Sequence, residues 1–569
     1  MARIRHLSIR RFRGLAHLDW APVAGVNALI GSGDVGKSTL LDGVALTLSA
    51  TRREVFYDTD FCNLDADVGF EIRVTLGDLP AELRDLERYS DYLRGWNAAT
   101  DTLEDEPSAI CEDAMTLQLR VGASLEGEWS LYSDRTQGQE SRDLSLPHRA
   151  LIAPIVLDQS PATHLRWSRQ SILQRLATPQ VGVRTLVAQA ARSLRENAQG
   201  LGDPATDAVL EQVRATGQEL GIEKAQQATV QLDAFGIPGW NASLALHDGN
   251  GVPLRCLGAG SASLLVAGLF RTLLAPGGIA LVDEVEHGLE PHRLGRLLKL
   301  LGAGTGDGPQ VFVTTHSPVV VCELSVHELA VLRFDPQLEV HEVRPVRLTA
   351  PGQNVQGVIR ACANALLAKH VIVCEGATEI GLLRGLDQFW SNAGLDSFAL
   401  CGVALTNGAG IPQAVERANT FSALGYRTLL VMDSDRPLMP DQLQACQQAA
   451  THIIEWGGAQ ATEDALFTGL AWLDVLALLN VAEATWTTAL LETNLRSHSV
   501  GRLGLDDCRS AETREHRELL ALTAKRQAWF KRIDFGEQIG RDVLGPALLR
   551  ASAALQAIFQ QLRTWVDDG

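Results

Sequence analysis

The sequence predicts an α/β protein built from two successive α/β domains. Short uninterrupted apolar runs bounded by turn residues, typical of buried parallel strands, alternate with helical patterns along the chain. The clearest runs are residues 279–282, 311–315, 370–374 and 428–432. A break rich in turn-forming residues, Thr-Ala-Pro-Gly-Gln-Asn at 349–354, separates the first two runs from the last two. We therefore expect one α/β domain on each side of this break.

Length and composition exclude several classes of protein. A chain of 569 residues is long enough for two or three domains, and 46% apolar with 21% charged residues argues against a mainly disordered chain. No apolar run is long enough to span a membrane, and the arginine-studded first 13 residues lack the pattern of a signal peptide. Nine scattered cysteines without a C-x-x-C pair indicate reduced thiols. These features predict a cytoplasmic protein with no membrane partner.

The net charge points away from nucleic acid. Acidic residues outnumber basic ones by 68 to 50, which gives a formal charge of −18. Nucleic-acid-binding proteins usually carry a basic excess. By itself the charge therefore argues against a DNA-binding function, and only specific motifs can overturn that expectation.

The first half of the chain reads as one α/β domain interrupted by a helical segment. Alternating apolar and basic residues at 3–13 predict one long strand or two short ones. Further strands are expected at 26–30, 70–76 and 115–121, a helix at 38–48, and an acidic loop at 101–113. Residues 165–230 are rich in Ala, Gln, Leu, Glu and Arg and are expected to be helical.

A phosphate-binding motif lies between the expected strand 26–30 and helix 38–48. The segment Gly31-Ser-Gly-Asp-Val-Gly36-Lys37-Ser38 satisfies the P-loop pattern in its proper strand–helix context. The glycines Gly31, Gly33 and Gly36 let backbone N–H groups wrap a phosphate at a helix N-terminus. Lys37 is expected to reach the β- and γ-phosphates of ATP and Ser38 to bind Mg²⁺, with Thr39 beside them. The alternative, a plain glycine-rich turn, is disfavoured by this context.

Two later strands end in residues suited to ATP hydrolysis. The run 279–282 ends in Asp283 and Glu284, which we expect to bind Mg²⁺ through water and to polarise the attacking water, respectively. The run 311–315 ends in His316, which can sense the γ-phosphate. Acidic residues at strand ends and single histidines often have purely structural roles. The prediction of an ATP-hydrolysis role therefore depends on their spacing from the P-loop.

Together these elements resemble the ABC-type ATPase head, in the branch that contains SMC proteins and their DNA-repair relatives. Leu257-Gly-Ala-Gly-Ser261 is similar to a diverged signature motif, with Gly258, Gly260 and Ser261 as its expected phosphate contacts. Residues 287–292 resemble the D-loop, and Gln159 is a candidate Q-loop residue. The resemblance implies a homodimer in which each P-loop faces the partner's signature helix across ATP.

The second domain carries a different set of acids. The run 370–374 leads into Glu375 and Glu379, and four-residue spacing places both on one helix face. The run 428–432 ends in Asp433 and Asp435, whose side chains point the same way. Four carboxylates at one edge of a parallel sheet repel each other, which predicts a site for Mg²⁺ or Mn²⁺. For either pair alone, helix-start acids or a strand-end turn remain an ordinary alternative.

Both acidic pairs resemble the TOPRIM signature, and residues 407–410 fit its glycine turn. An ABC head followed by TOPRIM is similar to the architecture of the OLD (overcoming lysogenization defect) family nucleases. This implies an ATPase at 1–164 and 231–350, a helical dimerisation insert at 165–230 and a TOPRIM domain at 365–569. By position in that family, Glu463 completes a second metal site and Lys531 is the catalytic lysine. Whether Asp464, Asp506 or Asp507 join the metal site stays open.

The resemblance implies an ATP-regulated, divalent-metal-dependent DNA endonuclease that hydrolyses or nicks DNA by a two-metal mechanism. It further implies a homodimer or higher oligomer and a role in bacterial anti-phage defence or DNA processing, with a helicase partner encoded nearby as one option. ATP could activate or inhibit cleavage. The alternatives are a DNA-tethering or repair ATPase with an inert TOPRIM domain, and a primase-like or RNA-processing enzyme. None of the five tyrosines adjoins the acidic motifs, which favours hydrolysis over strand passage.

Overall fold

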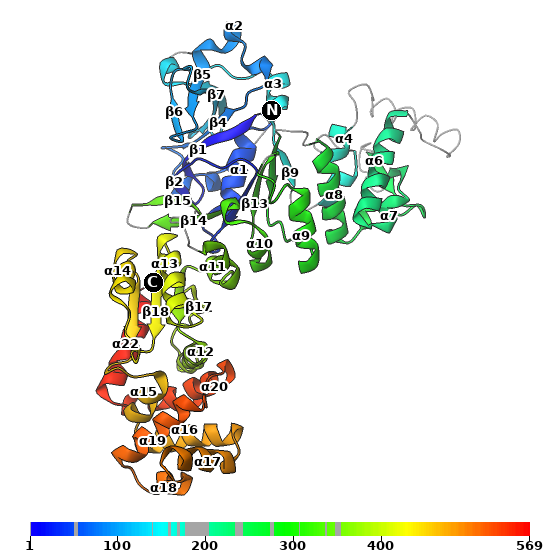
Figure 1. Cartoon of the computed structure of the whole chain (residues 1–569). Helices are drawn as coiled ribbons and strands as arrows, with labels where there is room; N and C mark the ends of the chain where they lie inside the picture. The colour runs from blue at the N-terminus through cyan, green and yellow to red at the C-terminus, as the bar shows by residue number, and fades with distance from the viewer. Residues whose placement is uncertain are drawn as a thin grey trace. The chain divides into compact units, whose positions relative to one another are not determined.

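The chain folds into two compact units, Met1–Pro351 and Gly352–Gly569 (Figure 1). The computed structural model describes residues 2–50, 55–138, 140–157, 161–167, 171–176, 204–233, 243–273, 278–306, 308–335, 338–346 and 354–568. The division between the units falls inside the turn-rich break at 349–354. Among the described residues, no helix combines the length and apolar character needed to cross a membrane.

A mixed sheet forms the frame of the first unit. Its described strands run in the order β6-β5-β7-β4-β1-β2-β15-β14-β3-β13-β12-β9, and β8 pairs with β7. The antiparallel part contains β1 (Arg3–Phe12), β2 (Leu15–Trp20), β4 (Phe70–Gly77), β5 (Leu93–Asn97), β6 (Thr102–Glu104), β7 (Glu112–Val121) and β8 (Gly127–Tyr132). The remaining strands are β3 (Val26–Ile30), β9 (Ile155–Leu157), β12 (Ile279–Val282), β13 (Gln310–Thr314), β14 (Leu329–Asp335) and β15 (Val340–Pro345).

The sheet order joins the two predicted halves of the first domain. Strand β3, from the first half, lies between β13 and β14 from the second, and pairs parallel to both. Strand β9 in turn pairs parallel to β12. Because β12 and β13 are buried on both faces, they contain continuous apolar runs rather than alternating ones. The predicted strands at 279–282 and 311–315 are thereby confirmed to within one residue.

Helices cover the sheet of the first unit, and α1 packs against its antiparallel part (Figure 1). On α1, Gly43 lies against Ile9 and Ile72 of β1 and β4, since a Cβ there would be 3.4 and 3.3 Å from their methyl carbons. The helices of this unit are α1 (Lys37–Thr47), α2 (Leu86–Tyr89), α3 (Leu146–Ile152), α4 (Ile172–Leu176), α6 (Pro204–Leu220), α7 (Glu223–Gln226), α8 (Ala259–Leu273), α9 (Pro291–Leu300) and α10 (Pro318–Glu323).

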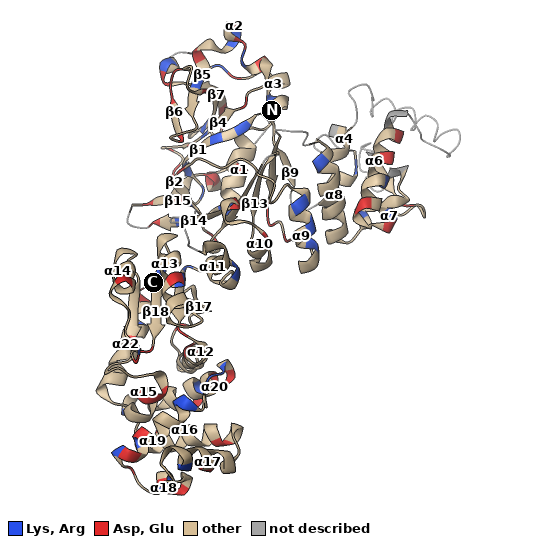
Figure 2. Ribbon diagram, viewed as in Figure 1, with Lys and Arg blue, Asp and Glu red and all other residues tan. Residues whose placement is uncertain are grey.

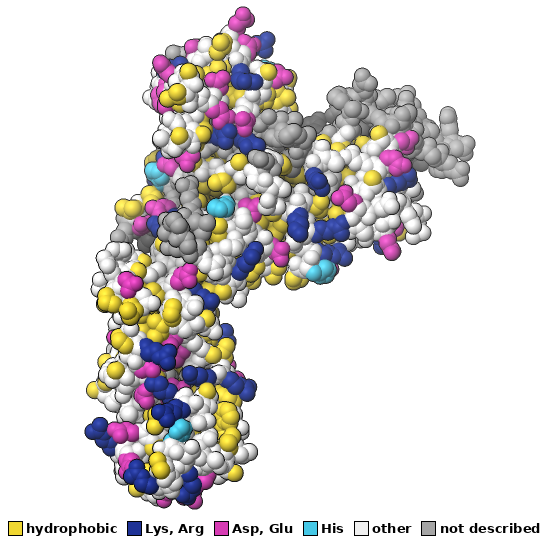
Figure 3. All heavy atoms as spheres, viewed as in Figure 1, with side chains coloured by type: hydrophobic (Ala, Val, Ile, Leu, Met, Phe, Trp, Pro, Cys, Tyr) yellow, Lys and Arg dark blue, Asp and Glu magenta, His cyan; other side chains and the backbone are white. Residues whose placement is uncertain are grey.

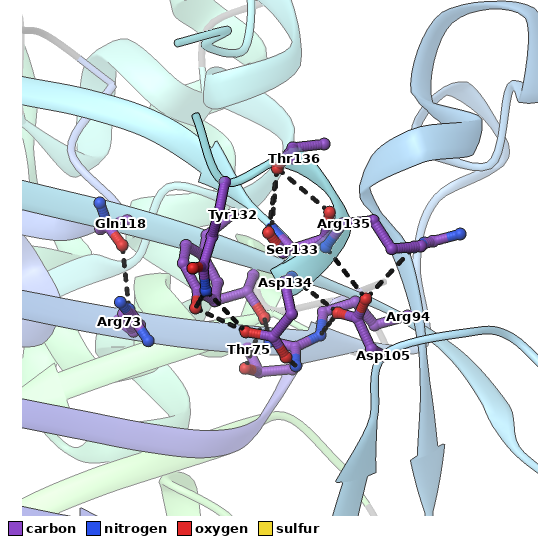
Figure 4. Close-up of polar contacts among 12 residues, drawn as sticks. Arg73, Thr75, Arg94, Asp105, Gln118, Tyr132, Ser133, Asp134, Arg135 and Thr136 are labelled. Atoms are coloured by element: carbon purple, nitrogen blue, oxygen red, sulfur yellow. Dashed lines mark hydrogen bonds and ion pairs between the residues drawn. The ribbon is translucent and has the colours of Figure 1, made fainter. Parts of the chain in front are cut away.

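The opposite face of β4 and β7 is polar. Figure 4 shows Arg73 of β4 bonded to Gln118 of β7, with 2.9 Å between Nε and Oε1. The Arg73 guanidinium lies 3.6 Å from the centre of the Tyr132 ring. Buried Arg94 pairs with Asp134 at 3.0 Å and also with Asp105. Such charge-assisted pairs stabilise charged side chains on a partly buried face.

Two predictions for the first unit need correction. The acidic stretch 101–113, predicted to be a loop, contains β6 and the start of β7, because Thr102–Glu104 pairs with β5. The segment 165–230, predicted to be helical, contains α4, α6 and α7 but ends in a strand, β10 (Thr229–Asp233), paired with β11 (Ser243–His247). In both places the strand is one arm of a local antiparallel hairpin, β5–β6 or β10–β11, whose backbone pairing composition does not reveal. Residues 177–203 of that segment lie outside the described residues.

The second unit is built on a four-stranded parallel sheet in the order β17-β16-β18-β19. Its strands are β16 (His370–Cys374), β17 (Val403–Asn407), β18 (Arg427–Met432) and β19 (His452–Glu455). Helices α11 (Val355–Ala361), α12 (Ala377–Asn392), α13 (Ile411–Ala423) and α14 (Pro440–Gln448) accompany the strands. The predicted strands at 370–374 and 428–432 are both present, in the centre of this sheet.

A helical region completes the second unit. It contains α15 (Thr462–Gly469), α16 (Trp472–Thr485), α17 (Thr488–His498), α18 (Leu505–Ser510), α19 (Arg514–Arg526), α20 (Ile533–Gln538), a π-helix (Ile539–Leu544), α21 (Gly545–Ala547) and α22 (Ala553–Asp567). Glycines let α12 approach α20 closely. A Cβ on Gly536 of α20 would lie 2.7 Å from the Thr378 carbonyl and 2.8 Å from Gly381 of α12. This contact fixes α12, which carries Glu379, against the segment that follows Lys531.

Candidate functional site

The loop after β3 has the shape of a phosphate-binding loop. Gly31 and Gly36 have φ angles of 143° and 97°, which side chains rarely adopt. A Cβ would lie 2.5 Å from the Leu332 carbonyl at Gly31 and 2.6 Å from Leu15 at Gly36. Gly33 differs, because a Cβ there would meet nothing within 4 Å. The fold therefore requires glycine at Gly31 and Gly36, whereas Gly33 leaves open space that a phosphate group can occupy.

Lys37, the first residue of α1, holds its charge inside this loop. The side chain is only 4% exposed, and Nζ donates to the carbonyls of Gly31 at 3.1 Å and Ser32 at 2.7 Å. Burial lowers the pKa of Lys37 to about 8, although Asp34 and Asp283 partly oppose the shift. Two uncharged carbonyl groups stabilise a buried ammonium less well than an anion would. A phosphate group in the loop would be a stronger partner, which fits the predicted contact with ATP.

Ser38 and Asp283 lie in contact although 245 residues separate them. Ser38 Oγ donates to Asp283 Oδ1 at 2.9 Å, and Thr314 Oγ1 donates to the same oxygen at 2.5 Å. The contact exists because β3, β13 and β12 are neighbours and end at one edge of the sheet. A hydroxyl and a carboxylate oxygen side by side are ligands that Mg²⁺ prefers. The two residues predicted from separate motifs to serve one Mg²⁺ are thus brought together.

Glu284 and His316 lie on the loops after the adjacent strands β12 and β13. Glu284 has φ 47°, a strained value for a non-glycine residue, and its backbone N–H donates to Thr314 Oγ1 at 2.8 Å. His316 is exposed. Its backbone N–H donates to Oε1 of Glu286 at 2.6 Å, and Thr315 Oγ1 donates to Oε2 at 2.7 Å.

The motif interpretation missed Glu286. Its carboxylate accepts both of these hydrogen bonds and so ties the loop after β12 to the loop after β13. The available signal was the third acidic residue in Asp-Glu-Val-Glu, two positions after Glu284.

The predicted signature segment begins α8 and contacts the predicted D-loop. A Cβ on buried Gly260 would lie 2.7 Å from the Gly288 carbonyl, so glycine permits this close approach. Ser261 Oγ accepts from Arg293 at 3.3 Å, while Gly258 is exposed. Thr39 is half-buried on α1. The candidate Q-loop residue Gln159 lies outside the described residues.

In the second unit, Glu375 and Asp433 meet where adjacent parallel strands end. The backbone N–H of Asp433 donates to Oε2 of Glu375 at 3.0 Å. Burial raises the pKa of Glu375 to about 7, and the nearby carboxylates of Asp433, Glu379 and Asp435 raise it further. These carboxylates therefore lie close enough to interact. Glu375 and Glu379 do not share a helix face as predicted, because Glu375 lies in the turn between β16 and α12.

Thr462 and Trp456 connect two of the predicted acids. Thr462 Oγ1 lies 2.7 Å from Glu379 Oε1 and 2.9 Å from Asp433 Oδ1. Trp456 Nε1 donates to Asp433 Oδ1 at 3.0 Å and to Thr462 Oγ1 at 2.8 Å. Both residues were missed, because a threonine and a tryptophan carry no sequence signal for such a role. Burial also raises the pKa values of Glu379 and Asp433.

Glu463, at the start of α15, presents a buried oxygen without a partner. The residue is 3% exposed, and its Oε1 has no hydrogen-bond partner within the described part of the chain. Burial raises the pKa of Glu463 to about 7; Asp433 and Glu379 add to the shift and the charge of Lys531 opposes it. A buried, unpartnered carboxylate oxygen beside other carboxylates is suited to a cation.

Asp435 has a different environment from the other acids. Its Oδ2 lies 2.8 Å from Nζ of Lys525 on α19, and the same ammonium lies 3.3 Å from Oδ2 of Asp464. Asp464 also accepts from the backbone N–H of Ala461 at 3.0 Å, at the start of α15. Asp507 instead accepts from Gly504 at the start of α18. Lys525 was missed as a member of the site, since 90 residues separate it from Asp435.

The oxygen ligands that the second unit offers are of the kind that binds a divalent cation, although the side chains are not arranged as a complete coordination shell. Within the described ranges, no group of three or more His, Cys, Asp or Glu side chains is placed to hold a metal ion. Hydrogen bonds from Thr462, Trp456 and the Asp433 amide occupy several of the carboxylate oxygens. The remaining donors are all oxygens, and one of them, Glu463 Oε1, is buried and unpaired.

A known protein family matches part of the first unit. Residues 128–322 match an AAA domain family. Its description is "AAA domain, putative AbiEii toxin, Type IV TA system". The matched segment contains Asp283, Glu284, His316 and the predicted signature helix, and supports an ATPase domain in the first unit. No curated protein matches the chain.

Solved structures similar to this chain include SMC heads and a recombination mediator. An Smc head domain derived from Pyrococcus furiosus, solved with the C-terminal domain of ScpA, has 13% identity and a TM-score of 0.36, covering 60% of this chain and 96% of that chain. The SMC head domain from Thermotoga maritima has 13% identity and a TM-score of 0.30, covering 61% and 100%. RecF with ATP has 11% identity and a TM-score of 0.35, covering 61% and 96%. Likenesses at this level assign neither activity nor partner.

Proposed function

We propose that the chain is an ATP-regulated, divalent-metal-dependent DNA endonuclease of the OLD type, with an ABC-type ATPase head and a C-terminal TOPRIM domain. One observation carries the nuclease half of the proposal. Glu375, Glu379, Asp433 and Glu463 come from three separate segments and converge at the carboxyl edge of a parallel sheet, with their pKa values raised. Buried like charges are costly unless a cation neutralises them, so a structural role alone does not account for them.

The first unit supplies the ATP site of the proposed enzyme. Lys37 and the open space beside Gly33 are suited to the phosphates, and Ser38 with Asp283 is suited to Mg²⁺. Glu284 and His316 are the candidates for water activation and γ-phosphate sensing. The predicted signature contacts, Gly258 and Ser261, serve ATP only in a dimer, where a second copy presents them to the P-loop. We therefore propose a homodimer or a higher homo-oligomer.

The second unit supplies the nuclease site. Glu375, Glu379, Asp433 and Glu463 would hold the metal, and Asp435 lies beside them. A bound divalent ion lowers the pKa of an attacking water and stabilises charge on the phosphate oxygens. Lys531 is exposed and close enough to Glu463 to lower its pKa, which supports the proposal that its ammonium neutralises a phosphate beside the acids.

Local positive charge compensates for the acidic excess of the chain. Lys525, Arg526, Lys531 and Arg532 follow one another within eight residues near the carboxylates. Figure 2 shows Lys and Arg in blue near α19 and α20 beside the acids in red, and Figure 3 shows basic side chains gathered on the surface of this unit. Phosphate contacts of this kind supply most sequence-independent DNA affinity. A role in anti-phage defence in the cytoplasm, with or without a helicase partner, is proposed from the family resemblance alone.

A nicking assay on supercoiled plasmid tests the proposal. The wild-type chain with Mg²⁺ or Mn²⁺ is expected to convert plasmid to the nicked form, and Glu375→Gln to lose at least about 100-fold of that activity. Glu515→Gln, which removes an exposed acid of the same unit, is the matched control. Parallel reactions with ATP, ADP and no nucleotide show whether the ATPase activates or inhibits. If wild type nicks no better than Glu375→Gln, the chain is instead a DNA-tethering or repair ATPase.

A further inference from the structure

The acids of the second unit divide into two groups with different counter-charges. Glu375, Glu379, Asp433 and Glu463 lie close together, and within the described residues none of them forms an ion pair with a Lys or Arg. Asp435 and Asp464 instead share the ammonium of Lys525, at 2.8 and 3.3 Å. The first group therefore lacks a directly paired cation, since Lys531 acts on Glu463 without forming an ion pair, whereas the second group already contains one.

From this difference we propose that Lys525 takes the place of a second metal ion, so that the site binds one divalent cation per chain rather than two. The inference rests on the proposed nuclease function and replaces the two-metal mechanism expected for it with a mechanism that uses one metal ion and one lysine. The Lys525 ammonium is a built-in monovalent cation between two carboxylates. A second divalent ion could bind Asp435 and Asp464 only by displacing it.

Electrostatics supports this division of roles. The ammonium nitrogen lies within contact distance of both carboxylates, and the side chain is only 34% exposed, so solvent screens the pairs incompletely. The Ala461 N–H donates to the same Asp464 oxygen, Oδ2, that faces Lys525, and so holds that oxygen in place. A divalent ion entering here would meet an existing positive charge a few ångströms away, and the two cations repel.

The position of Lys525 on its helix also limits its movement. It lies in the last turn of α19, where the helix dipole favours a cation. The preceding turns of α19 are anchored by buried Leu519, Leu520 and Ala524. The helix therefore holds the lysine stem beside α15, whose first turn carries both Glu463 and Asp464.

Metal stoichiometry tests the inference with a readout that does not depend on activity. Titration of the full chain with Mn²⁺ in the absence of nucleotide, followed by calorimetry and by the free-Mn²⁺ electron paramagnetic resonance signal, counts the ions bound. A Lys37→Ala background removes any contribution of the P-loop site. We expect one Mn²⁺ per chain when Lys525 is present and two for Lys525→Met. Lys369→Met, which removes an exposed lysine of the same unit, is expected to bind one.

Further variants assign the second ion to its proposed ligands. Adding Asp464→Asn to Lys525→Met should return the count to one, because it removes one of the two carboxylates that Lys525 pairs with. Two ions of similar affinity with Lys525 present, or one ion in Lys525→Met, would overturn the inference. A chain that binds no Mn²⁺ and does not nick DNA contradicts the proposed function itself. A chain that nicks DNA and binds two ions contradicts only the role of Lys525.

Discussion

Ser38 Oγ donates a hydrogen bond of 2.9 Å to Oδ1 of Asp283, which joins the phosphate-binding loop to the acid at the end of β12. The contact spans 245 residues of sequence and depends on β13 lying between β3 and β12. Neither residue is important for the core, since Ser38 is exposed and Asp283 is half-buried. Their juxtaposition is better explained by a shared ligand than by stability.

The first prediction concerns this pair. Ser38→Ala and Asp283→Asn should each weaken Mg²⁺–ATP binding by about 10- to 100-fold, since each removes one oxygen suited to the ion. The double variant should lose less than the sum of the two free-energy changes, because both act on one ion. Nucleotide titrations with and without Mg²⁺ measure this. Fully additive losses, or equal losses without Mg²⁺, would show that the residues do not share the ion.

A second prediction follows from the pKa of about 8 for Lys37. Phosphate groups favour the charged form, so ATP binding raises this pKa and takes up a proton above pH 8. ATP affinity should therefore fall as the pH rises beyond 8, by up to about tenfold per pH unit. Calorimetry at pH 7.5, 8.5 and 9.5 in buffers of different ionisation enthalpy measures both effects. Lys37→Arg stays charged throughout, and its affinity should change little over this range. Equal slopes in the two proteins would contradict the assignment.

The third prediction concerns the packing of α12 on α20. Gly536→Ala places a methyl group against the Thr378 carbonyl at 2.7 Å, so the helices must separate. We expect a loss of about 1–3 kcal/mol in unfolding free energy, although alanine favours a helix intrinsically. Gly457→Ala is the control, since a Cβ there meets nothing within 4 Å. Denaturant unfolding of the full chain compares them; equal stability of the two variants would mean that the helices do not pack this closely.

A fourth prediction concerns the metal-free site. The pKa values of Glu375 and Glu463 are about 7 in the folded chain, against an ordinary value of 4.5. The folded state thus binds more protons than the unfolded state between these two pH values. Proton binding therefore makes its full contribution to folding stability below pH 4.5, and this contribution is lost as the pH rises through 7. In EDTA, the melting temperature should fall between pH 5.5 and pH 8, and Mg²⁺ or Mn²⁺ should restore it at pH 8. Glu463→Gln should show a shallower fall; an unchanged slope in this variant would argue against a buried acid at this position.

The local sequence was sufficient to predict a candidate site residue and its strand wherever the motif directly follows that strand in the chain. The loop after β3, the Asp283–Glu284 pair and the acids after β16 and β18 all adjoin uninterrupted apolar runs. Such runs are readable because a strand buried on both faces requires apolar residues throughout. Prediction failed for β6 and β10, each of which pairs with its neighbour in a hairpin although its own sequence has no uninterrupted apolar run.

By itself, then, the sequence determined the α/β class, the break between the units and the identity of most candidate site residues. Only the tertiary structure decided which of them meet, Ser38 with Asp283 and Glu375 with Asp433. It also brought Lys525, which was not a predicted site residue, to Asp435. It also revealed Glu286, Thr462 and Trp456, whose contacts have no local signature. The physical reason is that strand and loop propensities depend on neighbouring residues. Which charged groups meet depends instead on the order of strands in a sheet and on the packing of helices that are far apart in the sequence.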